Sequence, residues 1–530
     1  MSSAANEQTG TLDHEDSIHG REYSIHGRVV LIGLDAADSQ LLTAAIDAGH
    51  LPSLAKMRDR GAWGNVPPLA GFGSGAVWPS FSTGVSPAKH GRYFYRQVGP
   101  GSYEAQDFHP DRFRADPVWV QASRAGRKVA VFDVPKVGLS DEINGVMAVD
   151  WISHGPVYPE MRTFPESFAD ELTGTFGRNS MRRCDMPGGR SIKEFRQFAE
   201  AMNDRVEQRE RCTRHYLEHG DFDLLVTVFA DPHCVGHQTW HIRDPKHPLH
   251  DPAALEQLGD PLLDVYRSID GAIGRIVDDI DDDTTVIVFS GTGMGPNYTG
   301  NHLLDDVLRR IEGRNATTVA RTVRYVKRRL KKILPRDVRR KSQKLKRRIE
   351  EQSLATDRAG RRAFAVPHND IAGAIRLNVV GREQHGLLER AEVDAYVGQL
   401  TKELQQLRNV DTGNAVVESV VRVSEHHSGD AIDDLPDLFV IWNRSAPIDR
   451  VQSSTVGTVE YVHRGNRTGD HEAESIFFAV GPQVEPGRVD DMQIYDFAPT
   501  IAALLGTEVD VTDGRVVEAL AGRASSRSRK

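Results

Sequence analysis

The sequence predicts an α/β protein of three layers, α/β/α, with a mainly parallel central sheet and a basic helical insertion. Two observations predict the layered core: short apolar runs rich in β-branched residues recur along the chain, and helical patterns separate them. Strand–helix alternation of this kind produces a parallel sheet that helices cover on both faces. A third observation, one block crowded with Lys and Arg, predicts the insertion.

Each of the runs that we expect to be buried strands is bounded by turn residues. The runs are 28–35, 128–135, 222–231, 284–291, 436–443 and 475–482. Helical patterns lie between them, for example at 39–61 and 262–280. Because ligands of parallel α/β sheets bind beyond the carboxyl ends of the strands, the residues directly after each run are the first candidates for a functional site.

The composition is that of a globular protein with a substantial core: 39% of the 530 residues are hydrophobic and 27% are charged. Three cysteines (Cys184, Cys212 and Cys234) are too few for a disulfide framework. The first residues contain no apolar signal segment, and no run of about 18 apolar residues predicts a membrane span. We therefore expect a cytoplasmic protein.

The basic block at 309–348 holds 18 Lys and Arg against two acidic residues, a net charge of +16 in a chain whose total is −9. Apolar residues recur at helical spacing within the block, which predicts an amphipathic helix or helix pair. One interpretation is a solvated cap on an acidic body, and another is a surface for anionic membranes. Nucleic acid is an unlikely partner because no aromatic platform accompanies the charge.

We expect one core domain that the insertion interrupts. The predicted segments are a flexible tail at 1–27, the first part of the core at 28–308, the basic helical insertion at 309–362, the second part of the core at 363–522 and a flexible tail at 523–530. The two tails are predicted to be unstructured because they are polar and lie at the chain ends.

Potential metal ligands follow several of the predicted strands. Asp35 comes directly after the first strand, where a carboxylate can bind a metal, accept a ribose hydroxyl or cap a helix. His233 and His237 follow the third strand four residues apart, so on a helical turn they share a face as paired metal ligands do. Further ligand types near strand ends are Asp231, His241 and His471. This concentration favours a metal site.

Two loops of small residues bring bare backbone to the same edge. The run at 284–291 opens into a loop with Gly291, Gly293 and Gly295, which a phosphate, a dinucleotide, a metal or another piece of chain could approach. That loop lacks the GK[ST] of a P-loop and does not follow the first strand, as a dinucleotide fingerprint does. The loop at 67–91 offers the hydroxyl of Ser74 but lacks the GxSxG of a nucleophile elbow.

Taken in order, these motifs resemble the alkaline phosphatase superfamily, in its branch of type I phosphodiesterases and nucleotide pyrophosphatases. The resemblance covers nearly all of 28–520. It rests on "VLIGLDAAD", on a hydroxyl residue ten positions before the glycine of "FSTGVSPAKHG", and on "HCVGH", "FSGTGMG", "GDH" and "IYDFAPTIAALLG".

The resemblance implies a hydrolase in which two divalent metals, about 4 Å apart, clamp the attacking and leaving oxygens of an in-line displacement. It implies that a Ser or Thr hydroxyl attacks phosphorus and forms a covalent intermediate. Asp35, Ser74, His237 and His471 match the family pattern residue by residue.

Three positions depart from the pattern. Gly291 and Thr292 stand where the nucleophile-side metal has an Asp and a His, so the glycine loop is interpreted as a metal loop that has lost its ligands. His233 stands where the second site has an Asp. The nucleophile-side site then keeps only Asp35 and Ser74, too few ligands to hold a metal tightly.

We therefore expect one divalent ion, most suitably Zn²⁺ with Mn²⁺ as an alternative, held by His233, His237 and His471. Asp231 is an alternative ligand, and Thr292 and His302 are accessory candidates, although His302 also fits a surface residue at a helix start. The expected function is metal-dependent hydrolysis of phosphate, phosphonate or sulfate esters through Ser74. The alternative is a catalytically impaired member that binds a ligand or a partner.

Overall fold

The computed structural model describes residues 27–108, 113–154, 158, 160–179, 181, 191–314, 351–368, 371–461, 467–490 and 492–522. Almost all of the two predicted tails, and 315–350 of the predicted insertion, lie outside the described residues.

A nine-stranded sheet forms the centre of the molecule, in the order β20-β2-β19-β9-β1-β8-β5-β6-β7. Five adjacent strands, from β9 to β6, are parallel to one another. The strands are β1 (Arg28–Leu34), β2 (Ala62–Val66), β5 (Val129–Phe132), β6 (Gly145–Val149), β7 (Arg162–Phe164), β8 (Leu224–Phe229), β9 (Thr284–Ser290), β19 (Ser475–Val480) and β20 (Gly487–Arg488). The predicted α/β class with a mainly parallel sheet is confirmed.

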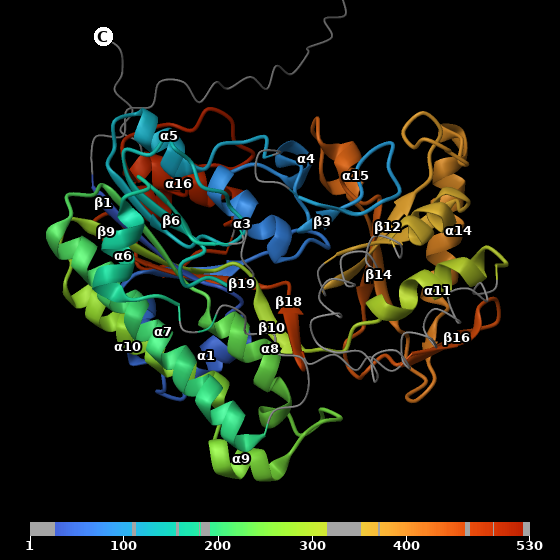
Figure 1. The fold of residues 1–530 in the computed structure, drawn as a ribbon, viewed down its shortest axis with the longest axis horizontal. Coiled ribbons are helices and arrows are strands. Elements are labelled where there is room, and N and C mark those ends of the chain that lie inside the picture. Colours follow the sequence, from blue (N-terminus) through green and yellow to red (C-terminus); the bar gives the residue numbers. More distant parts are fainter. Residues whose placement is uncertain are drawn as a thin grey trace, which may run out of the picture.

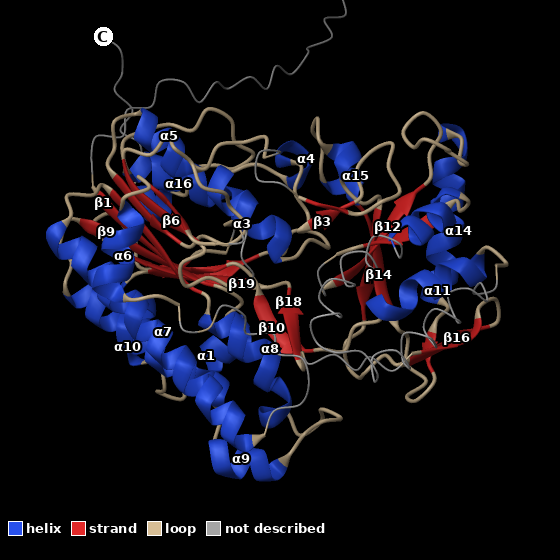
Figure 2. Cartoon of the chain, viewed as in Figure 1, coloured by secondary structure: helices blue, strands red, loops and turns tan. Residues whose placement is uncertain are grey.

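Helices cover both faces of this sheet, which gives the three predicted layers (Figures 1 and 2). Side chains of β1 alternate between two cores: Val29 and Leu31 belong to one, and Val30 and Ile32 to the other. The first core contains α3 (Ser74–Thr83), α5 (Val118–Arg124) and α16 (Phe497–Leu504). The second contains α1 (Ser39–Asp47), α2 (Pro52–Arg60), α6 (Phe168–Phe176), α7 (Ile192–His219), α8 (Asp231–Arg243) and α10 (Pro261–Asp278).

The helical pattern at 39–61 is two helices rather than one. Helix α1 ends at Asp47, and Gly49, which has a φ of +75°, turns the chain before α2 begins at Pro52. Proline at the first position of α2 suits its fixed φ. The pattern at 262–280 is the single helix α10.

A second, smaller sheet lies beside the central one and is antiparallel (Figure 1). Its order is β11 (Ala363–Val366), β12 (Ala372–Leu377), β15 (Leu438–Trp442) and β14 (Val417–Arg422). Helices α11 (Asn301–Ile311) and α14 (Val393–Gln405) pack against it.

Two of the predicted strands have a different role from the one expected. The run at 436–443 is β15 of the small antiparallel sheet, and the run at 475–482 is β19, which enters the central sheet antiparallel to β9. A short apolar run shows that a strand is buried, but it does not show the direction of its neighbours.

Smaller elements complete the described chain. They are β3 (Arg96–Gln97), β4 (Gln106–Asp107), β10 (Gly293–Pro296), β13 (Arg408–Asn409), β16 (Arg450–Ser453), β17 (Gly457–Glu460), β18 (Gly469–Glu472), α4 (Pro87–His90), α9 (Pro252–Leu258), α15 (Val423–His426) and α17 (Glu518–Ala521). Strands β10 and β18 pair as a two-stranded ribbon that carries His471.

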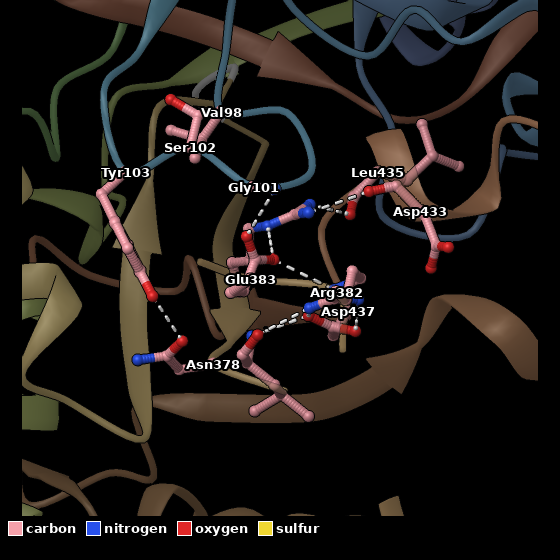
Figure 3. A network of polar contacts seen from close by, with 12 residues as sticks. Val98, Gly101, Ser102, Tyr103, Asn378, Arg382, Glu383, Asp433, Leu435 and Asp437 are labelled. Atoms are coloured by element: carbon pink, nitrogen blue, oxygen red, sulfur yellow. Dashed lines mark hydrogen bonds and ion pairs between the residues drawn. The ribbon is translucent and has the colours of Figure 1, made fainter. Parts of the chain in front are cut away.

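A network of buried polar side chains ties the loop after β3 to the second sheet (Figure 3). Arg376 donates to Glu383 over 2.6 Å, and Glu383 accepts from the backbone N–H of Gly101 over 3.2 Å. The Tyr103 hydroxyl donates to Asn378 over 2.9 Å. Since these groups are shielded from water, their pairing fixes the loop in one arrangement.

The described ends of the predicted insertion are helical and tied to the core. Arg309 at the end of α11 pairs with Asp357, 2.9 Å away, and Arg361 pairs with Asp305 at 2.6 Å. Arg361 is fully buried, whereas its partner Asp305 stays partly exposed, so the pairs tie the base of the insertion to α11. Among the helices of the described chain, none has both the length and the apolar character needed to cross a membrane.

Candidate metal centre

Asp35 lies directly beyond β1, at the carboxyl edge of the parallel strands. Its backbone N–H donates to the carbonyl of Phe229 on β8 over 2.9 Å, and its side chain is 2% exposed. The indole Nε1 of Trp78 donates to Asp35 Oδ1 over 3.0 Å. Burial raises the pKa of Asp35, while the positive charge of Lys136 and the hydrogen bond from Trp78 oppose that rise.

Ser74 is the first residue of α3 and is 3% exposed. Ser74 and Trp78 are four residues apart on this helix, so they share one face, and Trp78 contacts Asp35. That face therefore turns the start of α3 toward the end of β1. The N-terminus of a helix favours negative charge, so an anion at this end of α3 would be stabilised.

His233, His237 and His471 come together at the same edge. The first two share a face of α8, as the four-residue spacing predicts, and the third comes from β18. Ring centroids are 4.4 Å apart for His233–His237 and 4.9 Å apart for each of the other two pairs. All three residues are buried, and one ring nitrogen from each lies within 4.8 Å of the others.

The Nδ1 atoms of the three rings have different surroundings. His237 Nδ1 lies 2.7 Å from the carbonyl of Gly469, which can only accept, so Nδ1 carries the proton and the lone pair is on Nε2. His471 Nδ1 lies 3.3 Å from the Thr292 hydroxyl. His233 Nδ1 is buried without a hydrogen-bond partner. The contacts of His237 and His471 are typical of metal-binding histidines, in which one ring nitrogen binds the metal and the other makes a hydrogen bond that fixes the ring.

Burial favours the neutral, metal-binding form of two of the three rings, His233 and His237. Burial, followed by nearby positive charge, lowers the pKa of His237 well below its ordinary value, and burial with neighbouring rings does the same for His233. Three buried imidazoles, of which His233 has an unpartnered nitrogen, fit a single divalent ion with an open position.

Asp231, the alternative ligand, is not part of this group. It is the first residue of α8, and its Oδ1 lies 3.0 Å from Nε of Arg205, with both side chains almost fully buried. A buried carboxylate needs a compensating charge, and Arg205 supplies it. His241, one turn beyond His237, instead contacts the Thr468 hydroxyl at 3.0 Å.

His302 lies at the start of α11, half-buried, with its ring 5.7 Å from that of Tyr461. Helix α11 packs against the second sheet, so among the described residues His302 is not grouped with the three histidines. The interpretation of His302 as a helix-entry residue agrees with this placement.

Two residues near the histidines did not emerge from the sequence. His154 follows β6, its ring lies 3.8 Å from that of His233, and its Nδ1 lies 3.6 Å from Sγ of Cys234. Arg467 places Nη1 at 3.3 Å from Nε2 of His237, so this contact must break if a metal takes the same lone pair. The run at 145–149 was the available signal for His154, because that residue follows it as Asp35 follows β1.

The chain's own side chains approach the glycine loop. A Cβ at Gly291 would lie 3.2 Å from the Trp78 indole, a Cβ at Gly293 would lie 2.9 Å from Asp38, and one at Gly295 would lie 2.2 Å from Glu472. Asp38 also caps α1 by accepting from the N–H of Leu41. The bare backbone is therefore filled by protein at all three glycines.

The sequence profile of the type I phosphodiesterase/nucleotide pyrophosphatase family matches residues 29–382. The chain belongs to this family. It is thus a member of a family of hydrolases that act on phosphoric ester bonds. The matched segment includes Asp35, Ser74, His233 and His237, whereas His471 lies beyond it. No curated protein sequence matches the chain.

The solved structures that resemble the chain have low sequence identity to it. Murine ectonucleotide pyrophosphatase/phosphodiesterase 5 is 13% identical, with 92% of this chain and 97% of that chain covered and a TM-score of 0.48. The phosphonoacetate hydrolase of Sinorhizobium meliloti 1021 is 15% identical, with 89% and 94% covered and a TM-score of 0.49. The family assignment rests on the sequence match.

Proposed function

We propose that the protein hydrolyses phosphate or phosphonate esters, with one divalent ion at His233, His237 and His471 and with Ser74 as the nucleophile. The observation that carries the proposal is the convergence of three buried imidazoles beside the strand edge that also holds Asp35. Zn²⁺ is the ion that best suits three nitrogen ligands.

When bound, the ion would supply Lewis acidity toward a phosphoryl oxygen or activate a water molecule. The chain's own residues supply the rest of the proposed chemistry. Ser74 lies at a helix N-terminus, where developing negative charge is favoured. Trp78 holds the Asp35 carboxylate through its indole N–H, and Arg467 brings a guanidinium beside the histidines for an anionic substrate.

A second candidate function is a binding protein that has lost catalysis. The observation that favours it is the loop of Gly291 and Thr292, which offers no carboxylate or imidazole to a metal on the nucleophile side. In this case the histidines would hold an ion that binds an anionic ligand without turning it over.

The test compares wild type with Ser74→Ala on nitrophenyl phosphate monoesters, diesters, phosphonates and sulfates, each with Zn²⁺, Mn²⁺ and Mg²⁺. Phosphonoacetate and AMP, which occupy solved structures of the two proteins named above, extend the panel. Ser82→Ala is the matched control, because Ser82 is buried on the same helix and its hydroxyl donates to the carbonyl of Pro79. We expect Ser74→Ala to lose at least about 100-fold in rate and Ser82→Ala to keep its rate. Equal rates for all three proteins would contradict Ser74 as the nucleophile and would favour the binding function.

A further inference from the structure

The nucleophile-side metal site of the family pattern does not fit this chain. Gly291 offers no ligand, and the indole of Trp78 takes the adjacent space, with Cε2 and Nε1 only 3.2 and 3.3 Å from where a Cβ would lie. The same indole N–H donates to Asp35 Oδ1. A metal on this side would lack a ligand at position 291 and would compete with Trp78 for Asp35.

Thr292 also contacts the other side of the site rather than the nucleophile side. Its hydroxyl lies 3.3 Å from Nδ1 of His471, so it positions a histidine of the proposed metal centre. Of the family's nucleophile-side ligands, Asp35 and Ser74 therefore remain. A buried carboxylate next to an anionic substrate requires positive charge from another source.

Lys136 supplies a positive charge on this side. It lies in the loop after β5, which is separated from β1 in the sheet by β8 alone, so its position is at the same carboxyl edge as Asp35. The Lys136 backbone carbonyl accepts from the Arg92 guanidinium, which is itself buried. The side chain is half-buried. Burial lowers the pKa of Lys136 and raises that of Asp35, and the charge of each residue opposes the effect of burial on the other.

The backbone at Lys136 is left-handed, with a φ of +67°. Among the described residues, the other non-glycine residues with positive φ are Ala36, Asp133 and Asp150. All of these residues lie just beyond the carboxyl ends of β1, β5 or β6. Strain of this kind persists where surrounding structure enforces it, and it gathers at functional sites. The strained backbone at Lys136 is therefore a second indication, besides its position at this edge of the sheet, that the residue belongs to the functional site.

The ammonium of Lys136 is left available. Among the described residues it makes no hydrogen bond and no ion pair within 4.0 Å, although its charge interacts with that of Asp35 and of Asp150. It also acts on His154, which contacts His233. The charge of Lys136 thus acts on both Asp35 and His154, and among the described residues its N–H donors have no hydrogen-bond partner.

We propose that Lys136 takes the place of the nucleophile-side metal ion, binding a phosphoryl oxygen of the substrate with its ammonium opposite Asp35. The inference rests on the proposed function, because it concerns the same site. In this role Lys136 binds as a cation and makes or breaks no covalent bond. Its contribution is a fixed positive charge that binds the phosphoryl group and stabilises the charge that develops on it.

The test measures binding of inorganic phosphate to the purified full-length protein loaded with Zn²⁺, by isothermal titration calorimetry. Lys136→Met removes the charge, and Lys136→Arg keeps it. Lys136→Gly also removes the charge but suits the left-handed backbone, so its fold is secure even if the methionine variant is unstable. Lys128→Met, at the opposite end of β5, is the matched control.

We expect the methionine and glycine variants to lose at least about tenfold in phosphate affinity, with Zn²⁺ content unchanged, and the arginine variant to retain most of it. Lys128→Met should bind as wild type does. Unchanged phosphate affinity in Lys136→Gly would overturn the inference, and so would a second tightly bound metal in wild type. If phosphate binding depends on Lys136 while no ester is turned over, catalysis fails and this inference stands. If turnover depends on Ser74 but neither turnover nor phosphate binding depends on Lys136, the proposed function stands and the inference about Lys136 fails.

Discussion

Each histidine of the proposed centre has a distinct contact at the residue scale. The Gly469 carbonyl fixes the tautomer of His237, the Thr292 hydroxyl contacts His471, and Nδ1 of His233 has no partner. An unpaired buried nitrogen costs stability unless a ligand uses it. The proposed ion would use this nitrogen and remove that cost.

Acid should destabilise the metal-free protein. Burial lowers the pKa of His233 and His237 well below the ordinary value, and lowers that of His90 to about 3. The unfolded chain, with histidine pKa values near 6.5, then binds more protons than the fold as pH falls below about 6.5. Stability is fully present above that pH and is lost below it, by about 1.4 kcal/mol per group and pH unit.

Urea unfolding in EDTA at pH 7.5 and at pH 5.5 measures this dependence. The fold should be less stable at pH 5.5 by several kcal/mol, to which every such group contributes about 1.4 kcal/mol. A free energy of unfolding that stays constant between the two pH values would show that these rings are not held neutral.

Restoring the lost ligands should not by itself restore the second metal. Gly291→Asp with Thr292→His places a side chain against the Trp78 indole, 3.2 Å from the new Cβ, and removes the contact between Thr292 and His471. We expect the double variant to bind no additional metal, and the triple variant with Trp78→Phe to bind more than the double variant. Elemental analysis measures the metal content of the two variants. A second equivalent of metal in the double variant would show that Trp78 does not close the nucleophile-side site.

At the scale of elements, the loop after β3 depends on buried charge pairs (Figure 3). Arg376 is 1% exposed, and Arg376→Met would leave Glu383 with Arg382 as its remaining ion-pair partner, 3.0 Å away. Removing one partner of a buried pair costs about 3–5 kcal/mol, and the contact with Arg382 places the expected loss at the lower end.

Unfolding in urea measures the loss, and Glu383→Gln in the Arg376→Met background should recover part of it, because the buried carboxylate that lost one of its two ion-pair partners is then neutral. A single variant as stable as wild type would mean that the pair does not hold the loop to the second sheet.

The basic block at 309–348 remains a sequence-based prediction for most of its length. If it binds anionic membranes, co-sedimentation with phosphatidylserine vesicles should be strong at low salt and fall steeply at high salt, since each basic residue near the surface contributes about 1 kcal/mol. Neutral vesicles are the control. No binding at low salt would leave the solvated cap as the explanation of the charge.

At the scale of the whole molecule, local patterns predicted the layers and most of the strands. The spacing of His233 and His237 was informative because both lie on one helix, and Asp35 was identified because it follows a buried strand directly. The sequence could not reveal the antiparallel setting of β15 and β19, since strand direction is decided by distant neighbours.

The missed parts of the site are those assembled from separate loops. Trp78 could not be connected to Gly291, nor Lys136 to Asp35, because these pairs meet only after folding. Asp231 was a reasonable alternative ligand, but its pairing with Arg205 depends on the position of α7. The family match accounts for the residues that agree with the family pattern, whereas the residues that depart from it can be understood only from the structure.

The measurement that tests the account most directly is the metal content of full-length protein purified without chelator, for wild type, His237→Ala and His241→Ala. His241 is the matched control, one turn along α8 and bound to Thr468. We predict one equivalent of a divalent ion in wild type and in His241→Ala, and none in His237→Ala. Two equivalents in wild type, or an ion retained by His237→Ala, would contradict the account.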